Sequence, residues 1–455
     1  MSTSNVIGAN EAIPVPDLAG ASFGEPACEW TFVFVWLFTF AIYARPEDIL
    51  PSLGELHLTF ALGLCAGLAY FLALGSGGTR ISWSPQLQIV SLLTIWFFVG
   101  VPFAYWKGGS LHQLVHPWLK TFFIFFLLTQ VLVTADRIQK LLWAIILSEL
   151  LVTAYSIVES SKVMWVGDRM LGVSLGILGW NFLGIAAAST IPYMAALFVL
   201  RKSFLRTTLL IATVCSLMWM LVLTASRGGI LNVLVSIALS FLLVLRGSAR
   251  GKMVGVATVL ALMVSVSLAP TVFWERVGTL WNSSELQANM TAASARESTE
   301  DRLVALKQAV EYTLEHPIFG LGIGNFGIAS GIDVGQSTAW RSTHNTYAEI
   351  CSEAGVPALL LFIGLIITTL RNLTKIIRTI AAKDAELDLM ARATLVSVLS
   401  FSFGAIFAHL TYEYYLYYLI AIAVGLQQRA RASVELATTD WIPEYNANSS
   451  LPKMV

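Results

Sequence analysis

Apolar runs long enough to cross a bilayer recur along this chain of 455 residues. A spanning helix needs about 20 largely apolar residues, and a helix satisfies its backbone polar groups internally within lipid. We therefore expect transmembrane helices. They are placed near residues 30–44, 57–75, 85–105, 114–134, 138–158, 179–200, 206–224, 228–246, 252–273, 355–371, 390–409 and 412–427.

The composition is that of a membrane protein. Only 12% of the residues are charged and 56% are hydrophobic, whereas about a quarter of a soluble domain is charged. A chain this apolar must keep most of its surface in lipid. The sequence predicts an all-α integral membrane protein with about twelve transmembrane helices and one large extracytoplasmic helical loop. The formal net charge of zero argues against a nucleic-acid partner.

Lysine and arginine gather in alternate loops, which the positive-inside rule assigns to the cytosol. An even number of helices then leaves both termini inside and the polar segment after Phe273 outside. We expect a disordered cytosolic tail at 1–28, transmembrane helices 1–9 at 29–273, the outer loop at 274–355, helices 10–12 at 356–430 and a second cytosolic tail at 431–455.

The outer loop begins with an expected amphipathic helix, from about Ser298 to the helix-ending pair His316-Pro317. One face of this helix is apolar and would lie on the membrane or on the helix bundle: Leu303, Leu306, Val310 and Leu314. Glycines follow at 320, 322 and 324. They predict a tight turn rather than a phosphate-cradling loop, because they neither follow a strand nor open a long helix. His344 then precedes a short helix that leads into the tenth span.

Few positive residues are expected on the outer side, so each arginine there needs a reason: Arg169, Arg227 and Arg302. Arg227 lies in the tight turn 224–229 between two apolar helices. A cation is costly there unless water, a carboxylate or an anionic ligand meets it. Within the spans, Lys120 and Glu149 lie at similar depth, and we hypothesise a buried salt bridge between them.

The four cysteines show no metal-binding or disulfide spacing. Cys65 and Cys215 lie inside apolar runs. We expect both to be buried packing residues.

The outer features follow a distinctive order: Arg169-Met-Leu-Gly172 with Asn181 opening the next span, Ser226-Arg-Gly-Gly229, Arg302, His316-Pro-Ile-Phe-Gly-Leu-Gly-Ile-Gly-Asn-Phe326, and His344-Asn345 with Glu349, Glu353 and Gly355. In this order, spacing and common outer placement, the chain resembles the O-antigen ligase and polymerase superfamily of bacterial envelope glycosyltransferases. The likeness covers residues 165–370 in motif detail and the rest by topology.

The resemblance implies a multi-pass enzyme of the bacterial inner membrane with a periplasmic active site. Such enzymes take a glycan from undecaprenyl diphosphate and pass it to an acceptor. For ligases of lipopolysaccharide biosynthesis, the acceptor is a sugar hydroxyl of the lipid A core. The resemblance implies no nucleotide sugar, no metal and no other cofactor, and it implies the lipid bilayer and the carrier-linked glycan as partners.

The resemblance also assigns residues. Arg227 and Arg302 match two arginines for the diphosphate, with Arg169 as a third cation. Arginine suits this role because its planar guanidinium donates in pairs and stays charged. His344 matches the base that deprotonates the acceptor hydroxyl, since histidine titrates in the right range. Supporting roles fall to Asn345, Asn181 and Glu349, the last as a group that orients the imidazole.

Several functions share these motifs. A ligase is favoured, because one His-Asn site with two arginines matches that group best. An O-antigen or polysaccharide polymerase and a protein O-oligosaccharyltransferase are the alternatives, which differ in acceptor. A twelve-span transporter is a remote alternative, since it would place substrate charges at mid-membrane and show repeat symmetry between its halves.

Overall fold

The computed structural model describes residues 28–159, 164–166, 169–172, 180–200, 203–246, 249–278, 290–333, 335, 341–380 and 384–439. The helices are α1 (Glu29–Ala44), α2 (Pro46–Ile49), η2 (Pro51–Leu56), α3 (Leu58–Gly75), α4 (Pro85–Gly100), η3 (Val101–Phe103), α5 (Lys107–Gln113), η4 (Leu114–Trp118), α6 (Leu119–Val131), α7 (Ala135–Val158), α8 (Trp180–Leu200), α9 (Phe204–Thr224), α10 (Arg227–Leu243), α11 (Ala249–Ser267), α12 (Thr271–Gly278), α13 (Met290–Glu315), α14 (Phe326–Asp333), α15 (Thr346–Ile380), α16 (Ala385–Gly404) and α17 (Tyr414–Thr439). One antiparallel hairpin joins β1 (Met164–Val166) to β2 (Arg169–Gly172).

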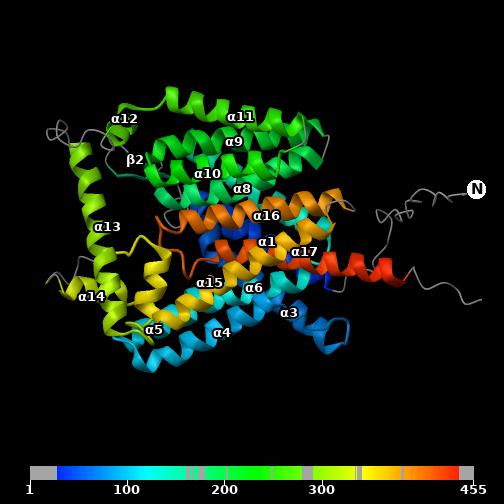
Figure 1. Cartoon of the computed structure of the whole chain (residues 1–455), viewed down its shortest axis with the longest axis horizontal. Coiled ribbons are helices and arrows are strands. Elements are labelled where there is room, and N and C mark those ends of the chain that lie inside the picture. The colour runs from blue at the N-terminus through cyan, green and yellow to red at the C-terminus, as the bar shows by residue number, and fades with distance from the viewer. Residues whose placement is uncertain are drawn as a thin grey trace, which may run out of the picture.

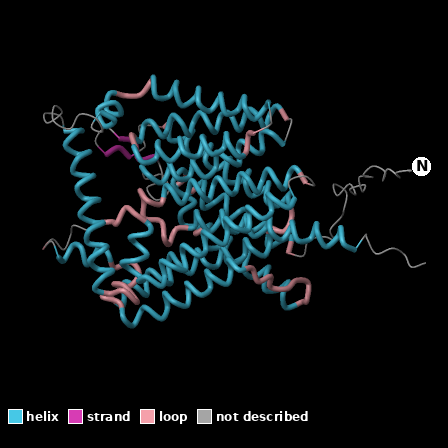
Figure 2. Tube along the Cα trace, in the orientation of Figure 1, coloured by secondary structure: helices cyan, strands magenta, loops and turns pink. Residues whose placement is uncertain are grey.

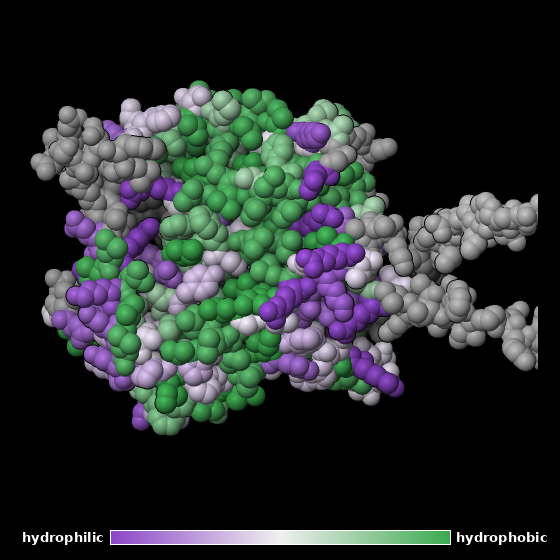
Figure 3. All heavy atoms as spheres, in the orientation of Figure 1, coloured by the Kyte–Doolittle hydropathy of each residue, from purple (hydrophilic) through white to green (hydrophobic). Residues whose placement is uncertain are grey.

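The long helices run side by side, and the polar outer segment covers one end of the bundle (Figure 1). α13 runs across the axes of the long helices at that end, where α5, α14, the hairpin and most of the loops also lie (Figure 2). The C-terminal end of α17 lies at the opposite end. A hydrophobic belt separates two hydrophilic ends in the space-filling view (Figure 3). The described residues of 274–355 and the end of α17 lie at opposite ends of the bundle (Figure 1), and the side of the membrane that each end faces stays a prediction.

The described residues contain eight helical segments long and apolar enough to cross a membrane: Pro51–Gly75, Pro85–Phe103, Lys107–Val131, Ala135–Val158, Phe182–Leu200, Phe204–Thr224, Thr346–Thr379 and Ala385–Gly404. Three shorter apolar helices accompany them: Glu29–Ala44, Arg227–Leu243 and Gly251–Ser267. A helical, multi-pass membrane protein is therefore confirmed. The twelve predicted runs all coincide with helices, but the number of crossings stays a prediction. The predicted tails lie outside the described residues, apart from Cys28 and residues 431–439, which continue α17.

Small residues bring α8 and α10 close together. A Cβ added to Gly184 of α8 would overlap the Cα of Gly229 in α10. Further along, Ser236 Oγ of α10 donates a hydrogen bond to the carbonyl of Ala188 at 2.5 Å. Helices in lipid associate through such close packing and interhelical hydrogen bonds, because lipid tails are as apolar as the helices. This packing fixes the first turn of α10, which begins with Arg227.

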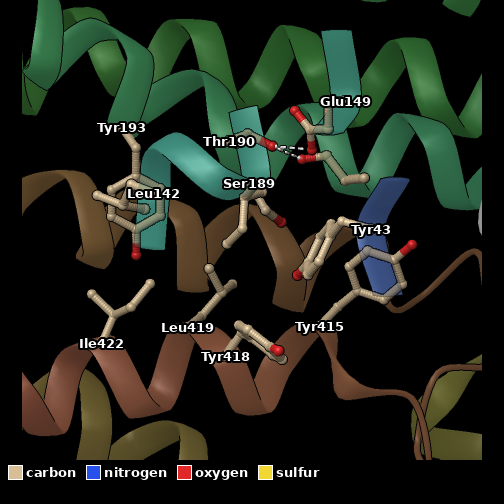
Figure 4. Close-up of a pocket in the computed structure, with 12 residues that line it drawn as sticks. Tyr43, Leu142, Glu149, Ser189, Thr190, Tyr193, Tyr415, Tyr418, Leu419 and Ile422 are labelled. Carbon is tan, nitrogen blue, oxygen red and sulfur yellow. Dashed lines mark hydrogen bonds between the residues drawn. The ribbon is translucent and has the colours of Figure 1, made fainter. Parts of the chain in front are cut away.

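The hypothesised salt bridge between Lys120 and Glu149 is wrong. Lys120 is exposed on α6. Glu149 is buried on α7 and accepts a hydrogen bond from Thr190 Oγ1 of α8 at 2.7 Å. Tyrosines of α1, α8 and α17 and the Glu149 carboxylate line a cavity of about 20 Å³ (Figure 4), which has room for one water molecule. Two residues at equal depth in the membrane can point in different directions, so depth alone does not predict a contact.

Burial was also mispredicted for one cysteine. Cys215 is exposed on α9, and Cys65 is partly buried on α3. An apolar run predicts a span, but part of every span faces lipid. A cysteine on that face is as compatible with the run as a buried one.

The close contact between α8 and α10 can be tested with one methyl group. Gly184→Ala should lower the free energy of unfolding by about 1–3 kcal/mol, because the added Cβ must push α10 away. Gly364→Ala in α15 is the matched control, since a Cβ there would meet no atom within 4 Å. Alanine is the better helix former by about 1 kcal/mol, so the control should be neutral or stabilising. Equal melting temperatures of the two variants in detergent would contradict the packing.

Candidate active site

Arg227 is the first residue of α10, and only Ala225 and Ser226 separate it from the end of α9. Ala225 adopts a left-handed conformation with φ 49°, and Ser226 Oγ caps α10 by accepting a hydrogen bond from the N–H of Gly229 at 3.1 Å. A cation at the start of a helix opposes the helix dipole, which favours anions there. An anionic ligand would offset this cost.

The first turn of α10 packs on the segment between α16 and α17, residues 405–413. A Cβ on Gly228 would lie 3.2 Å from the Cβ of Phe407. The neighbouring glycines at 228 and 229 therefore let α10 approach two elements at once, residues 405–413 and α8. This contact places Arg227 beside the segment that carries His409.

α13 differs from its prediction in two respects. It begins at Met290 rather than near Ser298, and it ends at Glu315 as expected. Its buried side chains are small or aromatic and pack against residues 321–329: Ala305, Ala309 and Tyr312. The predicted apolar face is exposed: Leu303, Leu306, Val310 and Leu314. The predicted alternative that this face packs on the bundle is therefore wrong. The alanine face packs there instead, because alanines let α13 approach residues 321–329 more closely than leucines would. Its contact with the membrane stays a prediction.

Arg302 lies on α13 and is partly buried. Its Nε is buried without a hydrogen-bond partner among the described residues. The adjacent Asp301 forms an ion pair with Arg341 at 3.2 Å, which joins α13 to the segment that leads to His344. Burial lowers the pKa of Arg302, and so does the charge of Arg227. The charge of Arg227 thus disfavours the charge of Arg302, and an anion bound by both would offset this effect.

The glycine-rich segment 318–326 is the tight turn that the sequence predicts. Its left-handed glycines are Gly320, Gly322 and Gly324, with φ of 63°, 89° and 76°. The N–H groups of Gly324 and Phe326 donate to the Glu353 carboxylate at 2.7 and 3.0 Å. The Tyr412 hydroxyl donates to the same carboxylate at 2.6 Å. A carboxylate of the protein itself therefore occupies the amide groups that a phosphate would have needed.

α15 is interrupted at Gly355, where φ is 81° and ψ is 174°. A Cβ on Gly355 would overlap the carbonyl of Ile318. Just beyond, the N–H of Val356 donates to the carbonyl of Pro317 at 2.9 Å. The short helix after His344, residues 346–354, and the start of an apolar helix near residue 355 are thus as predicted.

His344 directly precedes this short helix in a left-handed conformation with φ 48°. Asn345 caps the helix, since its Oδ1 accepts hydrogen bonds from the N–H groups of Tyr347 and Ala348 at 2.9 and 3.0 Å. A histidine in this conformation costs about 1–3 kcal/mol, and surrounding contacts must hold it. Asn345 supports the site in this sense, because its cap fixes the backbone beside His344.

Residues 405–413 fold back onto the start of α15. The N–H of Thr346 donates to the carbonyl of Ala405 at 2.8 Å, and Thr346 Oγ1 donates to the carbonyl of Ala408 at 2.7 Å. The next residue of the segment, His409, lies with its ring edge-on to His344. The ring centroids are 5.5 Å apart, and the planes meet at 74°. Two imidazoles from distant parts of the chain are therefore neighbours.

The resemblance predicts that Glu349 orients the His344 imidazole. The buried carboxylate of Glu349 accepts a hydrogen bond from the N–H of Thr411 at 3.0 Å. No hydrogen bond between Glu349 and His344 occurs in the described part of the chain. The contribution of Glu349 to the site is indirect, because it holds residues 405–413 in place.

Electrostatic effects connect these groups into one cluster. The pKa of His344 is lowered to about 4 by burial, by His409 and by Arg302, while Asp301 acts in the opposite direction. The charge of Arg227 in turn contributes to the lowered pKa of Arg302. At neutral pH the imidazole is therefore unprotonated and able to accept a proton, and both guanidiniums remain charged.

Two predicted site residues are described only in part. The backbone of Arg169 lies in β2, at the end of the bundle that α13 covers (Figure 1). Its side chain, like that of Asn181 at the start of α8, lies outside what the structure describes. Their roles stay predictions. Among the described residues, no three or more His, Cys, Asp or Glu side chains are grouped to hold a metal ion.

His409 is the member of this cluster that sequence reasoning missed. The only signal is the polar stretch His409-Leu-Thr-Tyr-Glu413 between the last two apolar runs. Such a stretch predicts a connection between helices. It does not predict that the connection folds back onto a histidine on another helix.

Residues 211–363 match the family model described as O-antigen ligase. The predicted resemblance to the O-antigen ligase superfamily is confirmed. The residues that match the family model include Arg227, Arg302 and His344, and they end before His409. The family consists of ligase- and polymerase-like membrane glycosyltransferases, in agreement with the helical, multi-pass structure. No match is found among curated proteins.

Glu353 should be essential for the structure of the region around the glycine-rich turn. Glu353→Gln turns an amide NH₂ toward one of three donors and removes the charge that all three stabilise. We expect a loss of about 1.5–3 kcal/mol in the free energy of unfolding, the usual contribution of hydrogen bonds to a charged group. Glu311→Gln on the exposed face of α13 is the matched control. A Glu353→Gln melting temperature equal to that of the control would show that these bonds contribute little.

Proposed function

We propose that this protein is an O-antigen ligase. It moves a glycan from undecaprenyl diphosphate to a sugar hydroxyl of the lipid A core, on the periplasmic face of the bacterial inner membrane. The proposal rests chiefly on one observation: Arg227 at the start of α10, Arg302 on α13 and His344 before α15 lie at the same end of a membrane helix bundle. The lowered pKa of His344 agrees with it. This combination suits a reaction in which an anionic group leaves and a base removes a proton from the acceptor.

Arg227 and Arg302 would bind the diphosphate of the donor. Charge develops on the leaving diphosphate as its bond to the anomeric carbon breaks, and fixed cations stabilise that charge. Arg227 and the partly buried Arg302 come from different elements, so their positions are set before the donor arrives. Prepositioned charge of this kind lowers the barrier without any reorganisation during the reaction. Arg169 would be a third cation at the same end.

His344 would accept the proton of the acceptor hydroxyl. The hydroxyl oxygen then forms a bond to the anomeric carbon, and the bond from that carbon to the diphosphate oxygen breaks with its electron pair. The products are the glycosylated acceptor, undecaprenyl diphosphate and a protonated His344, so charge and atoms balance. A single displacement of this kind inverts the anomeric configuration, and in our proposal it needs no metal.

The acceptor decides between a ligase and the related polymerases. Reconstituted protein would be given undecaprenyl-diphosphate-linked glycan together with either lipid A core or a second carrier-linked glycan. Product on lipid A core supports the ligase, whereas a longer carrier-linked chain would replace it with a polymerase. Absence of product with both acceptors would overturn the proposal.

The two proposed roles can be tested by substitution. His344→Ala should lower the transfer rate by about 10²–10⁴-fold, the usual contribution of a general base. Arg302→Gln should also abolish most transfer, because the leaving diphosphate loses a cation. Lys307→Gln is the matched control, since Lys307 is an exposed cation on the same helix. The assay is initial rate of glycan transfer in proteoliposomes, and an undiminished rate for either site variant would exclude that residue.

The low pKa of His344 predicts an unusual pH profile. An ordinary histidine loses its basic form below about pH 6.5. In His344 the basic form persists until the pH falls through about 4. We therefore expect kcat/KM, which reports the free enzyme, to stay level from pH 7 down to 5 in a short assay on prefolded protein. An acid limb centred near 6.5 would show that His344 is not held in its neutral form.

A further inference from the structure

Two histidines lie side by side in the candidate site, although the proposed reaction needs a single base. The rings of His344 and His409 lie edge to face, with centroids 5.5 Å apart. On its other side, His409 contacts the ring of Phe182 in α8 at 5.7 Å. His409 therefore sits between an apolar ring and the proposed base.

His409 has a polar atom that packing alone does not explain. Its Nδ1 is buried and has no hydrogen-bond partner among the described residues. A buried polar atom without a partner costs about 1–3 kcal/mol. Phenylalanine would fill the same space between Phe182 and His344 without this cost. An imidazole at this position therefore calls for a role of its own.

The pair is rigidly placed from both sides. Thr346, two residues after His344, is bonded to the backbone on both sides of His409. Its Oγ1 donates to the carbonyl of Ala408 at 2.7 Å and accepts from the N–H of Leu410 at 3.0 Å. These hydrogen bonds hold the backbone of His409 beside that of His344, so the two rings are kept next to each other.

Charged groups from several elements surround the pair. Arg302 and Asp301 face His344 from α13, and Asp301 is paired with Arg341. Glu413 faces His409 from the same segment. Arg45, which follows α1, faces Glu413 and forms an ion pair with Asp48 at 2.8 Å. Two imidazoles this close, with Arg302 nearby, cannot both carry a positive charge without strong repulsion.

We propose that His409 is a positioning residue for His344: it fixes the orientation of that ring and keeps it unprotonated until the acceptor hydroxyl delivers its proton. His409 acts through His344 and need not touch the substrate. The proposal deepens the proposed glycan transfer and rests on it for its catalytic meaning. The physical claim about the two rings can be tested without any substrate.

The deciding experiment measures the protonation of His344 directly. Diethyl pyrocarbonate modifies unprotonated imidazole, and peptide mass spectrometry reports the rate at His344 between pH 5 and 8. The wild-type rate relative to that of free imidazole should rise steeply toward pH 5, because His344 remains unprotonated there. His409→Phe keeps an aromatic ring but removes the nitrogens, so this relative rate should fall by about twofold or more at pH 5. Identical pH profiles in wild type and His409→Phe would overturn the proposal.

Two further variants serve as controls for misfolding and for the loss of a histidine elsewhere. His409→Gln is a second replacement that cannot become cationic, and it should show the same shift if His409→Phe fails to fold. His112→Phe removes an exposed histidine of α5 and should leave the His344 profile unchanged.

Transfer kinetics separate this proposal from the proposed function. His409→Phe should lower kcat about tenfold or more with an unchanged KM for the carrier-linked glycan, because the base rather than donor binding is affected. A wild-type protein that transfers no glycan would refute the proposed function, yet the labelling result would still stand. A wild type that transfers glycan and a His409→Phe variant with the same kcat and labelling profile would refute only the role of His409.

Discussion

The hydrogen bonds to the Glu353 carboxyl group are the interaction on which the rest of the candidate site depends. This group is buried, and three donors from two other segments meet it: the N–H groups of Gly324 and Phe326 and the hydroxyl of Tyr412. A buried carboxylate is stable only if hydrogen bonds or a cation compensate for lost water. The glycine-rich turn, the short helix after His344 and residues 405–413 are therefore joined at one point, and none of them can shift without breaking a hydrogen bond to a buried carboxyl group.

The hydrogen bonds around Glu353 explain how groups far apart in the sequence form one site. α10 contributes Arg227 because Gly228 and Gly229 let it pack against two neighbours. α13 contributes Arg302, and its alanine face holds it against the turn that Glu353 organises. His344 and His409 come from two segments that Thr346 and Glu349 bind together. Each element is simple, and the chemistry arises where they meet.

The sequence was most informative where one residue type has one physical meaning. Apolar runs gave the helices, the pair His316-Pro317 gave the end of α13, and the glycines at 320, 322 and 324 gave a tight turn. Arg227, Arg302 and His344 were selected as candidates from their motifs and predicted outer placement, and their roles stay predictions. The direction in which a side chain points was harder to predict: Lys120 was paired with Glu149 although it is exposed, and the leucine face of α13 was compatible with either the membrane or the bundle. His409 was missed, because its meaning depends on a fold-back that no local pattern encodes.

The left-handed backbone conformation of His344 opposes stability to the proposed activity. Glycine adopts φ near 48° without strain, and asparagine tolerates it better than most residues. Either residue at position 344 would relax the chain, yet neither could take up a proton. Selection for heat resistance alone would thus tend to remove the proposed base and leave a well-folded protein. In our proposal the histidine persists there under selection for turnover, so we would expect a relative that carries glycine at this place to lack the transfer reaction.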